Sequence, residues 1–209
     1  MPTVMYLLRH AATDANLARP ATLLGRRLDP PLARKGVRQA ELTRDFLGVR
    51  AIDHCYCSPM LRALETAKII AEPHDLVPTP LDGLIECHLG DWEGLDWQTI
   101  RTHHADAYKR FMSDPAEFGY PGGESFGDVA SRTCPVLDQL LANHTGEAIL
   151  VVGHHVVNRI YLARVLGLGP GHARQVKLDN CGISVVVRDG EETTVDTLNA
   201  SFHLQGAAA

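Results

Sequence analysis

Arginine and histidine side chains occur at three points of this sequence where chemistry on an anion could take place. Arg9 and His10 directly follow an apolar run near the N-terminus. Arg62 comes shortly after a second apolar run, and His154 closely follows a third. Arginine binds phosphate or carboxylate oxygens through a planar fork of donors, and histidine can act as base, nucleophile or donor. Brought together, these side chains could bind a phosphoryl group and supply its attacking atom.

Such a reaction also needs an acid behind the leaving oxygen. Glu86 lies just past an expected strand and is the candidate. For a single histidine, a structural or solvent-facing role would be the default, but the convergence of four such groups argues for a site. The sequence has no His-x-x-x-His pair and no Asp-rich cluster, so we expect neither a metal ion nor a cofactor.

Alternating strand and helix signals indicate how these residues meet. Strands are expected at 4–8, 52–57 and 148–152, and helices at 36–47, 58–71 and 156–166. This alternation predicts an α/β fold, a three-layer sandwich with a mostly parallel central sheet flanked by helices. Because parallel strands present their carboxyl ends at one edge, the three segments should converge there.

Turn and cap signals define the remaining elements. Ser58 and Pro59 are expected to begin the helix 58–71, as N-cap and first helical residue. Ser125 and Asp128 predict a capping box before a long helix that Pro135 should interrupt. The other expected elements are a polar helix over 96–112, strands over 175–198 with a turn at Asp189-Gly190, and a frayed alanine tail at 207–209.

Composition limits the classes of protein. The 209 residues are 45% apolar and 22% charged, which is ordinary for a globular chain, and we expect one domain over 1–209. A formal net charge of −5 does not favour nucleic acid or an anionic membrane as partner. No apolar run approaches a membrane span, and the first residues have no basic stretch before their apolar run, so we expect neither a membrane helix nor a secretory signal. Five cysteines without a CxxC spacing indicate reduced thiols in a cytoplasmic protein, a monomer or homodimer.

Six sequence blocks resemble those of the histidine phosphatase superfamily, also called phosphoglycerate-mutase-like. They occur in the family's order between residues 5 and about 204: Arg9-His10-Ala11-Ala12-Thr13, 25–40, Ser58-Pro59-Met60-Leu61-Arg62-Ala63, Glu86 with Gly90-Asp91-Trp92-Glu93-Gly94, Gly122-Gly123-Glu124-Ser125, and Val151-Val152-Gly153-His154. Any one block is weak evidence, whereas six in order are strong.

The resemblance implies a metal-independent phosphatase. His10 would be the nucleophile and pass through a phosphohistidine. Glu86 would be the general acid and then the base that activates water. The phosphoryl oxygens would be held by Arg9, Arg62 and His154, with Asn16 lining the phosphate pocket.

Three positions depart from the family pattern. Ala11 and Ala12 replace the usual Gly and Glu, and a backbone with positive φ at Ala11 would be strained. His155 stands where the family commonly has glycine. Its side chain could pack structurally or contact the substrate, and the sequence leaves both open.

Substrate choice would depend on an insertion at about 95–125, which the resemblance implies is a small helical cap. The candidate substrate contacts are Arg26, His155, Tyr108 and Tyr120, with a solvated loop or an apolar underside of the cap as the alternatives. The segment 95–120 is short and has only Arg101, Lys109 and Arg110 as basic residues. This favours a hydrolase for a small phosphorylated metabolite over a phosphoglycerate mutase or a non-catalytic phosphate-binding protein.

Overall fold

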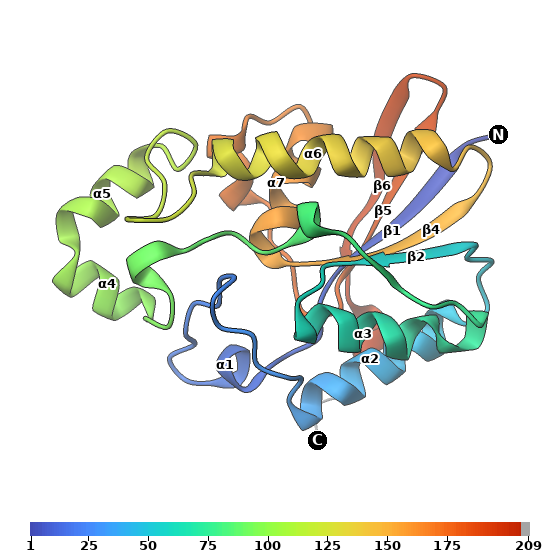
Figure 1. Cartoon of the computed structure of the whole chain (residues 1–209), viewed down its shortest axis with the longest axis horizontal. Helices are drawn as coiled ribbons and strands as arrows, with labels where there is room; N and C mark the ends of the chain where they lie inside the picture. Colours follow the sequence, from blue (N-terminus) through green and yellow to red (C-terminus); the bar gives the residue numbers. More distant parts are fainter. Residues whose placement is uncertain (206–209) are drawn as a thin grey trace.

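A six-stranded sheet forms the centre of the computed structural model, which describes residues 1–205; the alanine tail at 207–209 lies outside the described residues. The strand order is β3-β2-β4-β1-β5-β6 (Figure 1). The strands are β1 (Thr3–Arg9), β2 (His54–Cys57), β3 (Thr79–Pro80), β4 (Ala148–Gly153), β5 (Ile183–Asp189) and β6 (Glu192–Ala200). The first four are parallel, whereas β5 runs antiparallel to both β1 and β6.

Helices cover both faces of this sheet (Figure 1). On one side lie α2 (Arg34–Leu47) and α3 (Leu61–Ala71), and on the other lie α6 (Phe126–Asn143) and α7 (His155–Val165). The expected three-layer α/β fold with a mostly parallel sheet is therefore confirmed. The shorter helices are α1 (Asp14–Leu17), α4 (Trp97–His103), α5 (Ala105–Ser113), and the short 3₁₀ helices η1 (Glu72–His74), η2 (Asp82–Leu84), η3 (Gly90–Trp92), η4 (Pro170–Gln175) and η5 (Phe202–Leu204).

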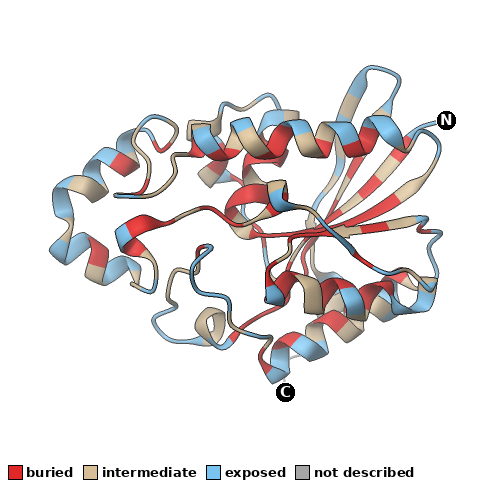
Figure 2. Cartoon of the chain, viewed as in Figure 1, coloured by how far each residue is buried: buried red, intermediate tan, exposed pale blue. Residues whose placement is uncertain are grey.

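Strand periodicity explains why two helical layers are needed. Leu7 of β1 and Val151 of β4 belong to the apolar cluster under α6 and α7. Leu8 and Val152, one residue further along, belong to the cluster on the opposite face. All four are essentially inaccessible to solvent, as expected for a sheet buried on both sides (Figure 2).

The expected start of α3 is wrong by two residues. Met60, not Ser58, is the N-cap, and the helix begins at Leu61. Ser58 instead continues the strand, because its N–H donates to the Val152 carbonyl of β4 at 3.0 Å. Its hydroxyl then accepts from the Met60 N–H at 3.3 Å, so Ser58 stabilises the turn that leads into the helix.

Three other expected elements need correction. Residues 96–112 form two helices, because α4 ends before His104 and α5 begins at Ala105. The strand pair begins at Ile183, not at 175, because residues up to Gln175 form the turn η4. The helix α6 continues through Pro135, although its capping box forms as expected.

Two more features bear on the type of protein. No helix among residues 1–205 is long and apolar enough to cross a membrane. All five cysteines are buried and unpaired. Burial raises the pKa of Cys55, Cys57, Cys87, Cys134 and Cys181, so they pack as small apolar side chains rather than as reactive thiolates.

Candidate active site

Three parallel strands end side by side at one edge of the sheet. Arg9, at the end of β1, is in register with Gly153, at the end of β4. The next residue, His10, donates its backbone N–H to the Gly153 carbonyl at 3.0 Å. His154 therefore lies beside His10, with ring centroids 5.2 Å apart. The first turn of α3, after β2, adds Arg62.

The hydrogen bonds of His10 determine which nitrogen is free. Its Nδ1 lies 2.7 Å from the carbonyl oxygen of Ala11. Because a carbonyl can only accept, Nδ1 carries the proton and Nε2 keeps its lone pair. The Nε–H of Arg62 donates to this Nε2 at 3.3 Å. His10 therefore presents an unprotonated nitrogen beside a guanidinium group.

Arg62 is fully buried, and most of its donors hold one loop. Its Nη2 donates to the carbonyl of Gly25 at 2.9 Å, and its Nη1 to the carbonyl of Leu28 at 3.0 Å. Asp29 completes the set with a 3.2 Å ion pair. The loop 25–29 is thus held by the same side chain that faces His10.

Arg9 and His154 have buried polar atoms without a partner among residues 1–205. Arg9 donates Nη1 to the Leu178 carbonyl at 2.9 Å, but its buried Nε has no partner in the described part of the chain. Neither ring nitrogen of the fully buried His154 has a partner there either. Buried polar atoms without partners are rare in folded proteins, and here they surround the free nitrogen of His10. The arrangement fits the oxygens of an anion.

Burial and neighbouring cations keep the imidazoles neutral. Desolvation, together with Arg62 and Arg9, holds the pKa of His10 well below its usual value. The pKa of His154 is lowered well below its usual value by the same causes and by His10. Burial lowers the pKa of Arg9 to about 10, so it stays cationic at neutral pH. Two neutral imidazoles and two guanidinium groups form a site suited to a dianion.

These shifts predict that the ligand-free protein loses stability in mild acid. Below pH of about 6.5 the unfolded chain takes up protons at His10, His154 and His155, whose pKa values are all lowered in the folded state. Each histidine should then reduce the free energy of unfolding by up to about 1.4 kcal/mol per pH unit. Denaturant unfolding between pH 7 and 5 measures the slope. His10→Asn should make it shallower, and an unchanged slope would contradict this assignment.

Glu86 occupies the wall of the same site. Its carboxylate is buried and accepts three backbone N–H groups. These come from Cys87 at 2.8 Å, and from Val156 and Val157 in the first turn of α7 at 3.2 and 3.4 Å. Helix N-termini favour negative charge, so α7 fixes the position of this side chain.

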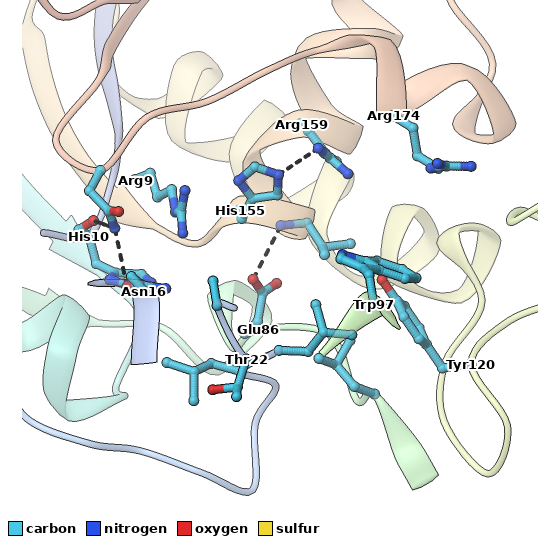
Figure 3. A pocket seen from close by; sticks show the side chains of 16 residues that line it. Arg9, His10, Asn16, Thr22, Glu86, Trp97, Tyr120, His155, Arg159 and Arg174 are labelled. Atoms are coloured by element: carbon cyan, nitrogen blue, oxygen red, sulfur yellow. Dashed lines mark hydrogen bonds between the residues drawn. The ribbon is translucent and has the colours of Figure 1, made fainter. Parts of the chain in front are cut away.

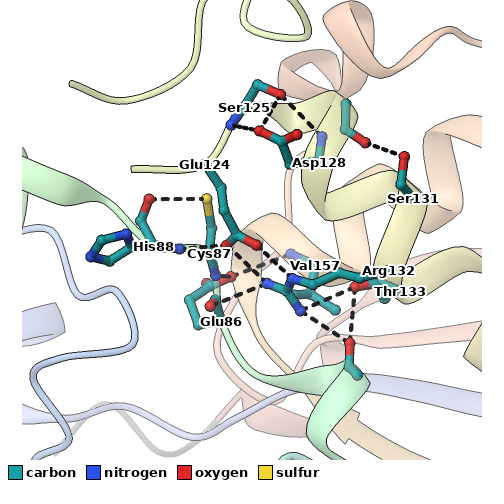
Figure 4. A network of polar contacts seen from close by, with 12 residues as sticks. Glu86, Cys87, His88, Glu124, Ser125, Asp128, Ser131, Arg132, Thr133 and Val157 are labelled. Carbon is teal, nitrogen blue, oxygen red and sulfur yellow. Dashed lines mark hydrogen bonds and ion pairs between the residues drawn. The ribbon is translucent and has the colours of Figure 1, made fainter. Parts of the chain in front are cut away.

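A second network holds the segment that carries Glu86 (Figure 4). Arg132 of α6 forms a 2.7 Å ion pair with Glu124, which in turn accepts the N–H of His88 at 2.7 Å. Arg132 also donates to the carbonyls of Gly83 and Glu86. The segment 83–88 is therefore held from both ends by α6 and by the turn before it.

These groups open into a cavity of about 460 Å³ (Figure 3). Arg9, His10 and Asn16 lie at one end, and Arg159 and Arg174 at the other, with Glu86 between them. The complete lining also includes residues 21–24, Leu89, Trp97, Tyr120, His155, Val156 and Asn180.

Most of the residues expected from the sequence meet at this cavity. Arg62 and His154 are sealed behind its wall, where Arg62 contacts His10 directly and the His154 ring lies against it. Arg26 and Tyr108, by contrast, do not line the cavity. Tyr120 does line the cavity, and nothing in the sequence around the two tyrosines distinguishes it from Tyr108.

Among the lining residues that the sequence did not predict, three have side chains that bear on the chemistry of the site. Asn180 donates to the carbonyl of His10 at 2.9 Å. Arg159 follows His155 by four residues, which places both on one side of α7 and could have been noticed. Arg174, in η4, has no signal in the sequence that points to the site.

The departures from the family pattern are accommodated without strain. Ala11 is not among the residues with positive φ, and its N–H donates to Thr66 Oγ1 at 3.0 Å. The next residue, Ala12, packs closely against Gly36 of α2: a Cβ on Gly36 would lie 1.9 Å from the Ala12 carbonyl oxygen. His155 accepts from Arg159 Nη2 at 2.5 Å, so this histidine lines the cavity and also positions an arginine.

One further group of potential ligands lies elsewhere. Among the residues that the structure describes, one group has potential ligand atoms close enough together to hold a metal ion: His54, His144 and Glu147. Glu147 Oε2 lies 3.2 Å from His54 Nε2 and 2.6 Å from His144 Nδ1. His54 begins β2 and Glu147 precedes β4, so this group is at the opposite edge of the sheet from the cavity.

The fold and the site together define a class: an α/β protein with histidine, arginine and carboxylate side chains gathered at one edge of its sheet. The chain belongs to the histidine phosphatase superfamily (branch 1), whose family model matches residues 5–201. It is a phosphoric monoester hydrolase.

Similar proteins cover nearly the whole chain. Phosphoserine phosphatase 1 of Hydrogenobacter thermophilus is 28% identical over 200 residues, 96% of this chain and 93% of that protein. The structure of Bacillus stearothermophilus YhfR is 28% identical with a TM-score of 0.88, covering 97% of this chain and 99% of that one. Phosphoserine phosphatase of Entamoeba histolytica, solved in complex with 3-phosphoglyceric acid, is 26% identical with a TM-score of 0.85 and coverage of 97% and 99%.

Proposed function

We propose that this phosphatase hydrolyses a small phosphomonoester through a phosphohistidine on His10, without a metal ion in the reaction. One observation carries the proposal. The unprotonated Nε2 of a neutral His10 faces the space where Arg62, Arg9 and the unpartnered His154 gather. A nucleophile with a free lone pair, surrounded by donors for three oxygens, is what phosphoryl transfer requires.

The first step forms the His10 Nε2–P bond and breaks the bond from phosphorus to the ester oxygen. Arg9, Arg62 and His154 hold the three non-bridging oxygens while charge shifts among them. In this scheme Glu86 is protonated when the substrate binds and gives that proton to the departing oxygen, so the alcohol leaves neutral.

The second step returns the enzyme to its starting state. Glu86, now ionised, takes a proton from water, whose oxygen attacks phosphorus as the N–P bond breaks. Inorganic phosphate leaves, and the lone pair returns to Nε2. Each group ends in the protonation state in which it began.

The cations of the site make a metal unnecessary in this scheme. Arg9 and Arg62 already supply the charge that a metal would bring to the phosphoryl oxygens. Glu86 is the one carboxylate among the residues that line the cavity, and its oxygens are taken by backbone donors. We therefore expect hydrolysis of a phosphomonoester panel to be unchanged by chelator.

The test is phosphate release from p-nitrophenyl phosphate, O-phosphoserine, glycerol 3-phosphate and sugar phosphates, each with and without EDTA. Full turnover of at least one substrate in EDTA supports the proposal. Activity that disappears with EDTA and returns with a divalent ion would overturn the metal-independent mechanism.

A phosphoglycerate mutase would use the same phosphohistidine but must keep the phosphoryl group on its substrate. The basic residues of the segment 95–120 do not serve that purpose here. Lys109 pairs with Asp106 at 3.9 Å, and the Arg110 guanidinium lies 4.8 Å over the Phe118 ring. None of its three basic residues lines the cavity. Formation of 2-phosphoglycerate from 3-phosphoglycerate faster than phosphate release would favour the mutase.

The names of the relatives indicate the size of the substrate. The Hydrogenobacter relative is named for phosphoserine, and the Entamoeba structure holds 3-phosphoglyceric acid. Both are small phosphorylated metabolites, and a cavity of about 460 Å³ accommodates molecules of that size.

A further inference from the structure

The cavity carries more positive charge than one phosphoryl group requires. Arg9 and His10 lie at the reacting end, with Arg62 and His154 buried behind His10, and Glu86 faces the middle. The far end holds two additional arginines. Among residues 1–205, neither Arg159 nor Arg174 lies within 4.0 Å of a carboxylate. Neither guanidinium is therefore paired with a carboxylate in the described part of the chain.

Arg159 is held in place but keeps donors free. It stands on α7, one turn after His155, and donates Nη2 to that ring at 2.5 Å. Its buried Nε has no partner in the described part of the chain. Burial lowers its pKa, and the positive charge of Arg174 lowers it further. An anion that accepted hydrogen bonds from these free donors would stabilise the buried positive charge of Arg159.

Arg174 approaches the same space from a different element. It belongs to η4, is half-buried, and makes no hydrogen bond within the described residues. Its guanidinium lies 5.9 Å over the ring of Phe111 in α5. This distance is at the limit of a cation–π contact, which leaves the N–H donors unused. Figure 3 shows the two arginines adjacent at the end of the cavity opposite His10.

We propose that Arg159 and Arg174 bind a second anionic group of the substrate, a carboxylate or a second phosphate. The natural substrate is then a phosphomonoester that carries another anion a few bonds from its ester oxygen. This inference rests on the proposed function, because it places the reacting phosphoryl group at His10. It assigns substrate choice to α7 and η4, not to Arg26 of the loop after the first motif.

The order of groups along the cavity sets the shape of that substrate. The phosphoryl group lies against His10, the ester oxygen points to Glu86, and the second anion reaches the arginines beyond. Like charges on Arg159 and Arg174 repel each other in the empty site, and an anion between them relieves that repulsion. A site built around such a group should discriminate strongly against analogues that lack it.

The experiment compares matched substrates. 3-Phosphoglycerate and glycerol 3-phosphate differ only in a carboxylate against a hydroxymethyl group. 1,3-Propanediol bisphosphate and propyl phosphate form the corresponding pair for a second phosphate. The wild-type protein should show kcat/KM at least about tenfold higher for the charged member of one pair, and that pair identifies the anion.

Variants then locate the preference. Arg174→Gln alters a half-buried side chain without hydrogen bonds, so folding should be preserved. It should raise KM for the charged substrate about tenfold and leave the uncharged member within about twofold. Arg159→Lys keeps the charge but loses the fork, and should remove part of the preference. Arg101→Gln, an exposed arginine of α4 that does not line the cavity, is the matched control and should change neither substrate.

The results separate the two proposals. Equal kcat/KM within both pairs, or a preference that survives Arg174→Gln with Arg159→Lys, would overturn the second-anion site. Turnover of p-nitrophenyl phosphate in that case would still support the phosphatase mechanism. A wild-type protein that turns over neither p-nitrophenyl phosphate nor any of the four substrates would overturn both.

Discussion

Replacement of His10 by alanine is expected to lower kcat for every phosphomonoester by at least about 10³-fold. The change removes the imidazole whose unprotonated Nε2 is the proposed attacking atom, so no N–P bond can form. Binding should survive better than turnover, because Arg9, Arg62 and His154 remain. Steady-state kinetics on p-nitrophenyl phosphate measures the loss.

Two readouts distinguish a lost nucleophile from a damaged fold. The wild-type protein, quenched in alkali during turnover, should carry phosphate that is stable to base and labile to acid, and His10→Ala should carry none. His103→Ala, an exposed histidine of α4, should retain full activity. A His10→Ala protein with wild-type turnover would exclude His10 as nucleophile.

Replacement of Glu86 by glutamine should separate substrates by their leaving groups. Gln cannot give a proton to the departing oxygen or accept one from water, so alkyl phosphates should lose about 10²–10⁴-fold in kcat. p-Nitrophenolate departs with little help, so p-nitrophenyl phosphate should lose less in its first step. Burst kinetics on p-nitrophenyl phosphate should then show phosphoenzyme accumulating, because hydrolysis of the intermediate also lacks its base.

The glutamine amide also tests whether Glu86 acts only through position. The side-chain oxygen of Gln can still accept from Cys87 and Val157, while its amide group faces the Val156 N–H. Thermal unfolding of the variant reports any resulting destabilisation. Equal losses of kcat/KM, which reports the first step, on alkyl and aryl phosphates with an unchanged melting temperature would assign the proton donation to a different group.

The convergence of Arg9, His10 and His154 could be predicted from the sequence because it depends on local patterns. An apolar run followed by Arg9 and His10, and another followed by His154, indicate strand ends. In a parallel sheet those ends meet, and the structure places the two imidazoles 5.2 Å apart. Arg62 follows the same logic through the turn after β2.

The far end of the cavity depends on contacts between distant segments, and the sequence carried little sign of it. Arg174 reaches the cavity because η4 packs against α6 and α7, which brings its guanidinium to 5.9 Å from the Phe111 ring of α5. Arg26 looked equally suitable as a basic loop residue, yet it does not line the cavity. Propensity does not distinguish such side chains, because their direction is set by tertiary packing.

The same limit explains the misplaced start of α3. Ser58 followed by Pro59 is a strong local signal for a helix start. The backbone hydrogen bond from Ser58 N–H to the Val152 carbonyl extends the pairing of β2 with β4 by one residue beyond Cys57. The helix N-cap is therefore Met60. A long-range hydrogen bond thus outweighed a favourable local pattern.

The first turns of α7 restrict how this enzyme can evolve. His154 caps this helix, its second and third residues hold Glu86, and Arg159 stands one turn further on. A shift of α7 would therefore disturb the phosphoryl contacts, the acid and the distant arginine together. The helices α4 and α5 reach the cavity through Trp97 and the packing of Phe111 alone, so substitutions there can change the accepted alcohol while the reaction stays intact. We therefore expect new substrate specificities to arise from substitutions in residues 95–120 and 170–175, while α7 changes little.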